Sequence, residues 1–430
     1  MQVELAYGQT GLSVDLPDFN TTVVESVFAP GILDEERAIT ESLQHPLGAP
    51  PLTQMINPSD SVAIVVCDAT RAMPSKRVLP VILKTLQRAG IHPGRLSIIN
   101  ALGTHRPSPR HELIEFLGGG IVETYRIVQH DCTGYANMAC AGRLSNGSDL
   151  WVNRDYYEAD LKILTGLIEP HFFAGFSGGG KLVLPGIASL ENIMESHSHA
   201  MLSDPGATWG ITDGNPVWEQ ITEAAELTCP SFIVNVALNR DRQITGVFSG
   251  ELRTAHAAGV EHVKQSAMRA LSSPFDIVVT TNSGYPLDRN LYQTVKGMTA
   301  ARGIVKKGGA IVIAAECRDG VPTGSSFQQL LLTSANPAGA MGLLAKEGFS
   351  MPDQWQVQMQ AQVQLHARVF LYSTGLRPEE IQNAMLIPCL RIEDTIEELM
   401  HEYGPGASIC VLPEGPETIP YLSNRAELGE

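Results

Sequence analysis

Asp160–Gly186 reads DLKILTGLIEPHFFAGFSGGGKLVLPG, and this stretch decides how the rest of the chain is interpreted. Its first part, Leu161–Ile168, is an apolar run that stops before Pro170, which is typical of a strand buried on both faces. The eleven residues from His171 to Lys181 then hold a histidine, three phenylalanines, a serine, four glycines and a lysine. So many glycines let the backbone approach a ligand closely, at a cost in stability that packing alone would not justify. We therefore expect a binding loop at the carboxyl end of a buried strand.

The loop partly matches a known phosphate-binding motif. Gly175–Lys181 fits the first part of G-x-x-x-x-G-K-[ST], but Leu182 stands where a hydroxyl should hold magnesium. Pro185 then falls where the motif needs an uninterrupted helix. These departures disfavour a nucleoside triphosphatase. In a glycine-walled pocket, Lys181 could instead lose its proton and act as a nucleophile or covalent anchor, whereas the alternative is an exposed loop lysine without function.

Length and charge limit the class of protein. A chain of 430 residues exceeds one ordinary core, so we expect two domains. An apolar fraction of 43% and a charged fraction of 18% are typical of a globular protein in water. The net charge of -16 disfavours nucleic acid and anionic membranes as partners, so an anionic substrate would need a local basic pocket.

The cysteines and the N-terminus indicate the compartment. Seven cysteines are scattered without C-x-x-C spacing, which favours a reducing environment over a disulfide framework or structural zinc. No signal peptide is visible, and no apolar run approaches the ~20 residues of a membrane span. We expect a cytoplasmic protein.

Two further strands, Val62–Cys67 and Leu96–Leu102, each end in polar residues. The first runs into DATR, which ends at Arg71, and the second runs into GTHRP, which contains His105. Because parallel strands bring their carboxyl ends to one edge of a sheet, these residues should lie near His171. Arg71 precedes a helix, where it could bind a carboxylate or phosphate, although a surface salt bridge is an equally compatible role.

After the glycine loop, the sequence predicts one helix from Ser189 to about Leu202. His197 lies on its apolar stripe and His199 faces outward, so the two histidines do not form a chelating pair. If one of them binds a metal ion, we expect it to be His197. The alternative role is that of a core histidine with satisfied hydrogen bonds.

A second set of α/β elements follows the Ser-Ser-Pro sequence at 272–274. The expected helix Leu291–Ala301 carries Gln293 and Lys296 at i and i+3, where an amide and an ammonium group could grip a carboxylate or form a solvated face. The fold class is therefore α/β, with two domains that each contain a mostly parallel sheet flanked by helices. We expect the domains to span 1–270 and 275–412, with a tail of about 413–430 that packs back on the first domain.

Six motifs taken together resemble a known family. In chain order they are DATR, GTHRP, EPHFFAGFSGGGKLVLPG, HSHA, DGNP and YQTVKGM, and the similarity to the lactate racemase family extends over nearly the whole chain. The resemblance implies an isomerase, a racemase or epimerase that inverts C2 of lactate or a related 2-hydroxy acid by reversible hydride transfer. Its cofactor would be the nickel-pincer nucleotide, pyridinium-3-thioamide-5-thiocarboxylic acid mononucleotide with Ni, supplied by cofactor-biosynthesis proteins. Longer, dicarboxylic and sugar 2-hydroxy acids stay open as substrates.

The resemblance also assigns roles to single residues. Lys181 matches the lysine that tethers the cofactor, and His197 matches the nickel ligand. His105 and His171 match the two acid/base histidines. Further matches are residues near the cofactor (Asp68, Thr70, Gly178, Gly179 and Gly180) and residues near the substrate (Arg71, Tyr292, Gln293, Lys296 and Trp355). The N-terminal domain would bind the cofactor and the C-terminal domain would close over the substrate, with the active site in the cleft between them.

Three alternatives stay open. A nucleoside triphosphate enzyme would use Gly175–Lys181 as a phosphate cradle. A zinc-dependent hydrolase would hold its metal with His105, His171 and His197. A non-catalytic protein would bind a 2-hydroxy acid or a nucleotide without converting it.

Overall fold

The computed structural model describes residues 1–25, 27 and 29–423, and the chain forms two compact units. The first, here called the β4 unit, consists of Phe28–His197 and Gly206–Ser266. The second, the β15 unit, consists of Met1–Val27, Ser198–Pro205 and Ala267–Glu430. Each unit contains one six-stranded, mostly parallel sheet with helices, so the expected α/β class is confirmed.

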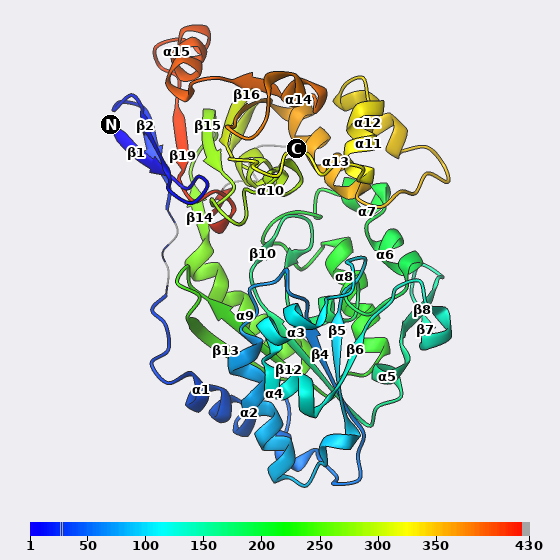
Figure 1. Cartoon of the computed structure of the whole chain (residues 1–430). Helices are drawn as coiled ribbons and strands as arrows, with labels where there is room; N and C mark the ends of the chain where they lie inside the picture. The colour runs from blue at the N-terminus through cyan, green and yellow to red at the C-terminus, as the bar shows by residue number, and fades with distance from the viewer. Residues whose placement is uncertain (26, 28, 424–430) are drawn as a thin grey trace. The chain divides into compact units, whose positions relative to one another are not determined.

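The sheet of the β4 unit is parallel except at one edge (Figure 1). Its strands, in spatial order, are β13 (Ile244–Gly250), β12 (Phe232–Leu238), β9 (Leu161–Leu167), β4 (Val62–Cys67), β5 (Leu96–Ala101) and β6 (Arg126–Gln129). Only β13 runs antiparallel to its neighbour. β4 is VAIVVC, an apolar, β-branched run that is buried on both faces, as a central parallel strand should be.

Helices connect the strands of this unit, and several of them pack with the sheet in one hydrophobic cluster. They are α1 (Glu35–Gln44), α2 (Ser75–Arg88), α3 (Arg110–Leu117), α4 (Gly119–Thr124), α5 (Arg154–Tyr157), α6 (Leu190–Ser196), α8 (Pro216–Leu227) and α9 (Leu252–Ala267). α2 shows the pattern clearly, since its buried residues, among them Val78, Ile82 and Leu86, follow helical spacing and join the strand side chains in one cluster.

The expected single helix from Ser189 to Leu202 is wrong. α6 ends at Ser196, and α7 (His199–Ser203) begins after a break at His197. The break has a local cause: the Ser198 side chain accepts a hydrogen bond from the Met201 N–H and so caps a new helix. His197 therefore stands at a helix end rather than within a helix.

The sheet of the β15 unit is parallel throughout. Its strands, in spatial order, are β18 (Ile387–Cys389), β17 (Arg368–Tyr372), β16 (Val305–Ala314), β15 (Phe275–Thr281), β19 (Ile409–Leu412) and β3 (Thr21–Val23). The helices are α7, α10 (Leu291–Arg302), α11 (Ser326–Thr333), α12 (Pro337–Leu344), α13 (Gln354–His366), α14 (Pro378–Asn383) and α15 (Ile392–Tyr403). Two-stranded pairs complete the fold: β1 (Gln2–Leu5) with β2 (Leu12–Asp15), β7 (Met138–Arg143) with β8 (Asp149–Asn153), β10 (Pro170–His171) with β11 (Gly175–Phe176), and β14 (Met268–Leu271) with β20 (Ile419–Leu422).

The two units divide the chain differently from the expected domains 1–270 and 275–412. The first residues belong to the β15 unit because β3 pairs with β19. The described part of the expected tail also stays in that unit, since β20 pairs with β14, whereas 424–430 lie outside the described residues. Among residues 1–25, 27 and 29–423, no helix has the length and apolar character needed to cross a bilayer.

Candidate active site

Three predicted site residues of the β4 unit follow three neighbouring strands. β9, β4 and β5 are consecutive and parallel, so their carboxyl ends lie on one edge of the sheet. Asp68 follows β4, His105 follows β5 after a short turn, and His171 follows β9. The expectation that these strand ends share one edge is confirmed. This edge is also where open α/β sheets bind their ligands.

His105 is oriented by a buried carboxylate. Its Nδ1 lies 2.6 Å from Oδ2 of Asp68, and the Thr70 hydroxyl donates to the other carboxylate oxygen at 2.8 Å. Asp68 is only 5% exposed, whereas the imidazole of His105 is exposed. Burial alone would raise the pKa of Asp68, but the hydrogen bond and charge of His105, with the charge of Arg71, outweigh it and hold that pKa below its usual value. Because the carboxylate can only accept, Nδ1 of His105 carries a proton and Nε2 presents the lone pair when the ring is neutral.

A second group is built around the ring of Phe173. The ring centroid of His171 lies 4.5 Å from that of Phe173, and the centroid of His197 lies 5.1 Å from it, both edge-on. The Nζ of Lys181 stands 5.6 Å from the same centroid. The structure therefore gathers three predicted functional residues around one buried aromatic side chain. The sequence identifies Phe173 only as one of the loop's aromatic residues, and nothing in its local sequence distinguishes it from its neighbours.

The path of the loop explains how this group forms. After β9, the chain makes a hairpin in which β10 pairs with β11, with His171 opposite Gly175. The backbone of Gly175 has φ +72°, and a Cβ there would lie 2.0 Å from the carbonyl oxygen of Ile211. Only glycine fits that position. The chain then turns through a 3-10 helix, Gly179–Leu182, which carries Lys181.

Gly178, Gly179 and Gly180 also have neighbouring protein atoms where a Cβ would lie. A Cβ on Gly178 would lie 2.7 Å from Oδ1 of Asn235, and one on Gly179 would lie 2.8 Å from Cδ2 of His256. A Cβ on Gly180 would lie 2.9 Å from a backbone oxygen of α8. The structure thus gives a protein-packing reason for these glycines, and cofactor contact by Gly178, Gly179 and Gly180 stays a prediction.

Two buried polar side chains contact the backbone of the glycine loop. The Gly179 N–H donates to Oδ1 of Asn235 at 2.8 Å, and Nε2 of His256 lies 2.9 Å from the carbonyl oxygen of Ser177. His256 also stacks on Trp218, with ring centroids 4.5 Å apart. Burial lowers the pKa of His256 to about 4, so its ring is neutral near pH 7. Neither residue is among the predicted site residues; for Asn235, the sequence does contain a signal, an amide within the apolar strand FIVNVAL.

His197 has the orientation of a metal ligand. It is 6% exposed, and its Nδ1 lies 2.9 Å from the carbonyl oxygen of Ile193 and 2.9 Å from the hydroxyl of Ser196. Because a carbonyl only accepts, Nδ1 carries the proton and Nε2 has the lone pair, which is the usual arrangement of a ligating histidine. Burial and the nearby charge of Lys181 lower the pKa of His197 to about 3.

Of the remaining predicted residues, Arg71 follows β4 in the β4 unit and the others lie in the β15 unit. Trp355, on α13, donates from Nε1 to the hydroxyl of Tyr292 at 3.1 Å, and that hydroxyl donates to Asp353 at 3.2 Å. Gln293 and Lys296 lie on α10 with Tyr292. The structure thus brings Tyr292 and Trp355 together.

Comparison with known proteins identifies the family. Residues 7–210 match the model of the lactate racemase N-terminal domain, and residues 271–419 match that of the lactate racemase C-terminal domain. The lactate racemase of Thermoanaerobacterium thermosaccharolyticum is 33% identical over 422 residues, which cover 97% of this chain and 98% of that protein. This chain belongs to the lactate racemase family. It is an isomerase of that family.

Two further similarities agree with the family. The lactate racemase of Lactiplantibacillus plantarum is 35% identical over 419 residues, covering 96% of this chain and 98% of that protein. The solved structure of the lactate racemase apoprotein from Thermoanaerobacterium thermosaccharolyticum superimposes with a TM-score of 0.91 and covers 98% of this chain and 100% of its own. A structure from Thermotoga maritima, at 20% identity and a TM-score of 0.68, covers 92% of this chain and shares the fold.

Two alternatives lose support in this member of the lactate racemase family. A phosphate-binding loop leads into an α-helix, whereas Lys181 lies in a 3-10 turn and the next α-helix begins at Leu190. A zinc hydrolase would need His105, His171 and His197 to converge, but within the described part of the chain no three His, Cys, Asp or Glu side chains are placed to hold a metal ion.

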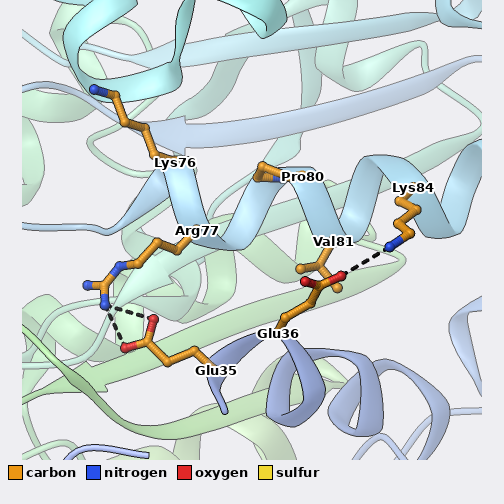
Figure 2. A pocket seen from close by; sticks show the side chains of 7 residues that line it. All are labelled: Glu35, Glu36, Lys76, Arg77, Pro80, Val81 and Lys84. Carbon is orange, nitrogen blue, oxygen red and sulfur yellow. Dashed lines mark hydrogen bonds and ion pairs between the residues drawn. The ribbon is translucent and has the colours of Figure 1, made fainter. Parts of the chain in front are cut away.

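A charged pocket of about 430 Å³ between α1 and α2 is separate from these residues (Figure 2). The Arg77 guanidinium in it contacts both carboxylate oxygens of Glu35, at 2.5 and 2.7 Å, and Lys84 contacts Glu36 at 3.1 Å. None of the predicted site residues lines this pocket. Both carboxylates in the pocket are paired with basic side chains, and we assign it no role in the reaction.

Proposed function

We propose that this chain is a racemase or epimerase that inverts C2 of a 2-hydroxy acid and carries the nickel-pincer nucleotide on Lys181. One observation carries the proposal: in a member of the lactate racemase family, the residues matched to the tether, the nickel ligand and one acid/base histidine surround the ring of Phe173. Loading would require proteins that make the cofactor.

The residues present fit this cofactor. His197 would ligate nickel through Nε2, because its Nδ1–H donates to the Ile193 carbonyl, and imidazole suits nickel. A single protein ligand is what a nucleotide that brings its own sulfur and carbon donors would need. Lys181 lies in a glycine turn next to the same aromatic ring and would form the covalent tether.

A hydride route avoids a difficult proton removal, because a carboxylate beside the reacting carbon stabilises a carbanion poorly. When bound, the nucleotide would supply the acceptor and donor of hydride for C2 of the substrate. His105 would take the hydroxyl proton at Nε2, while Asp68 holds Nδ1–H and stabilises the imidazolium that forms.

His171 would serve the opposite face of the substrate. In this structure, the Ala174 N–H donates to its Nδ1 at 3.2 Å, so the proton of the neutral ring is on Nε2. His105 and His171 are thus held in opposite tautomers. To accept a proton at Nε2, His171 must exchange its tautomer and give up the Ala174 contact, whereas His105 needs no such change.

The substrate carboxylate would be held by cations. We assign this role to Arg71 and Lys296, with Gln293 as an amide partner, because a fixed carboxylate lets the carbon invert without leaving the site. Tyr292 and Trp355 would form a wall of the substrate pocket, supported by their mutual hydrogen bond. Lactate is the first substrate to test, followed by longer, dicarboxylic and sugar 2-hydroxy acids.

Isotope retention tests the chemistry. The protein, produced together with the cofactor-making proteins, is given one enantiomer of C2-deuterated lactate or another 2-hydroxy acid in ordinary water. Hydride transfer predicts that the opposite enantiomer forms with its deuterium retained, and that Lys181→Ala forms none. Exchange of the deuterium with solvent at the rate of inversion would contradict the proposal, as would no inversion of any 2-hydroxy acid.

A further inference from the structure

α13 is a buried helix in which every second residue is glutamine. Its sequence is QWQVQMQAQVQLH over Gln354–His366, and residues 354–361 are all buried. Burying a long amide side chain costs free energy unless its polar atoms are hydrogen-bonded. The hydrogen-bond partners of these glutamines therefore show what the helix holds in place.

Two of the glutamines hold α7. Nε2 of Gln358 donates to the carbonyl oxygen of His199 at 3.0 Å and to the hydroxyl of Ser203 at 3.1 Å. Nε2 of Gln362 donates to the carbonyl oxygen of Leu202 at 2.9 Å. α7 has only five residues, too few to be stable as an isolated helix, so its position depends on contacts of this kind.

α7 begins directly after the predicted nickel ligand. His197 belongs to the β4 unit and Ser198–Pro205 belongs to the β15 unit, so the chain passes from one unit to the other at the peptide bond after His197. On one side, the imidazole is held by the Ile193 carbonyl. On the other side, the backbone continues into a segment that the glutamines of α13 fix.

The same helix also holds an element matched to substrate binding. The Gln356 side chain donates from Nε2 to the carbonyl oxygen of Tyr292 on α10, and Trp355 contacts the Tyr292 hydroxyl. α13 thus connects, within the β15 unit, the helix that carries the predicted substrate residues and the segment that follows His197.

We propose that Gln358 and Gln362 are positioning residues for His197: by fixing α7, they limit how far the backbone of His197 can turn its ring away from the metal. The inference rests on the proposed function, in which His197 ligates nickel. Neither glutamine touches the metal or the substrate. Releasing α7 should therefore speed nickel loss and leave the covalent tether at Lys181 unchanged.

The test compares matched methionine variants, which keep the side-chain length and remove Nε2. The double variant Gln358→Met/Gln362→Met and the single variant Gln362→Met release α7. Gln360→Met is the control, because Gln360 is as buried as Gln358 on the same helix but donates from Nε2 to the carbonyl oxygen of Ala384, at 2.7 Å. Each protein is loaded with cofactor and mixed with excess EDTA, and the nickel that stays bound is measured over time beside the intact mass.

We expect nickel to leave the double variant about tenfold faster than the wild type, the size of effect typical of residues that orient a metal ligand. Gln362→Met should be intermediate and Gln360→Met unchanged, with the Lys181 adduct present in all four proteins. Equal rates of nickel loss in the wild type, the control and both α7 variants would overturn the inference. If the wild type instead carried neither adduct nor nickel, the proposed function itself would fail, and the inference with it.

Discussion

Replacement of Asp68 by asparagine tests how His105 is positioned. The carboxylate oxygen lies 2.6 Å from Nδ1 of His105 at a site where Asp68 is 5% exposed. Hydrogen bonds to charged groups contribute about 1.5–3 kcal/mol. If that amount stabilises the imidazolium formed during proton transfer and is lost in Asp68→Asn, kcat should fall about 10- to 150-fold. The KM should change little, because Asp68 is not predicted to contact the substrate.

The assay follows inversion of each enantiomer by chiral chromatography on cofactor-loaded protein. Asp160→Asn is a suitable control, since Asp160 also accepts hydrogen bonds, from Ser61, but directly precedes β9, at the amino end of that strand and not at its carboxyl end. The pKa of Asp68 is held below its usual value of about 3.9, so the carboxylate that accepts the Nδ1–H of His105 stays ionised above that pH and is lost only as the pH falls through the folded-state pKa. The variant should therefore be slower at every pH from about 5 upward. An Asp68→Asn protein with wild-type kcat would refute this role for Asp68.

Three other predictions concern the histidines and the glycine loop. His105→Ala or His171→Ala alone should slow inversion in both directions, since each imidazole serves as acid and as base; normal rates from both enantiomers would rule out the two-histidine scheme. Gly179→Ala should lower the fraction of chains with a Lys181 adduct, measured by intact mass, because its Cβ would meet His256 at 2.8 Å and its φ is +52°, whereas Gly120→Ala, with open space around it, should load normally. His256 has a folded-state pKa of about 4, below the unfolded value of about 6.5, so the folded state loses stability as the pH falls from about 6.5 towards 4, by up to about 1.4 kcal/mol per pH unit. Urea unfolding at several pH values should show a smaller loss in His256→Gln. An unchanged dependence of the unfolding free energy on pH in that variant would contradict this prediction.

The buried strands could be predicted because each is specified locally. Val62–Cys67 matches β4 at both ends, since a continuous apolar run between polar residues indicates a central parallel strand without further information. The neighbouring strand ends then placed Asp68, His105 and His171 on one edge of the sheet. That step needed only the rule that parallel strands share their direction.

Features set by contacts between distant segments could not be predicted. β3 joins the second sheet through β19, almost four hundred residues later in the sequence, so the first residues read as part of the first domain. The break at His197 depends on a serine cap that competes with a continuous apolar stripe. The packing of the glycine loop depends on Asn235 and His256, whose sequence neighbourhoods contain no motif.

Intact mass combined with nickel analysis tests whether Lys181 carries the nickel-pincer nucleotide. The protein would be produced alongside the cofactor-making proteins, and the wild type would be compared with Lys181→Ala. We predict a covalent nucleotide adduct and stoichiometric nickel in the wild type, and the loss of the adduct and of turnover in the variant. A bare wild-type chain that still inverts a 2-hydroxy acid, or a Lys181→Ala protein with full activity, would contradict it.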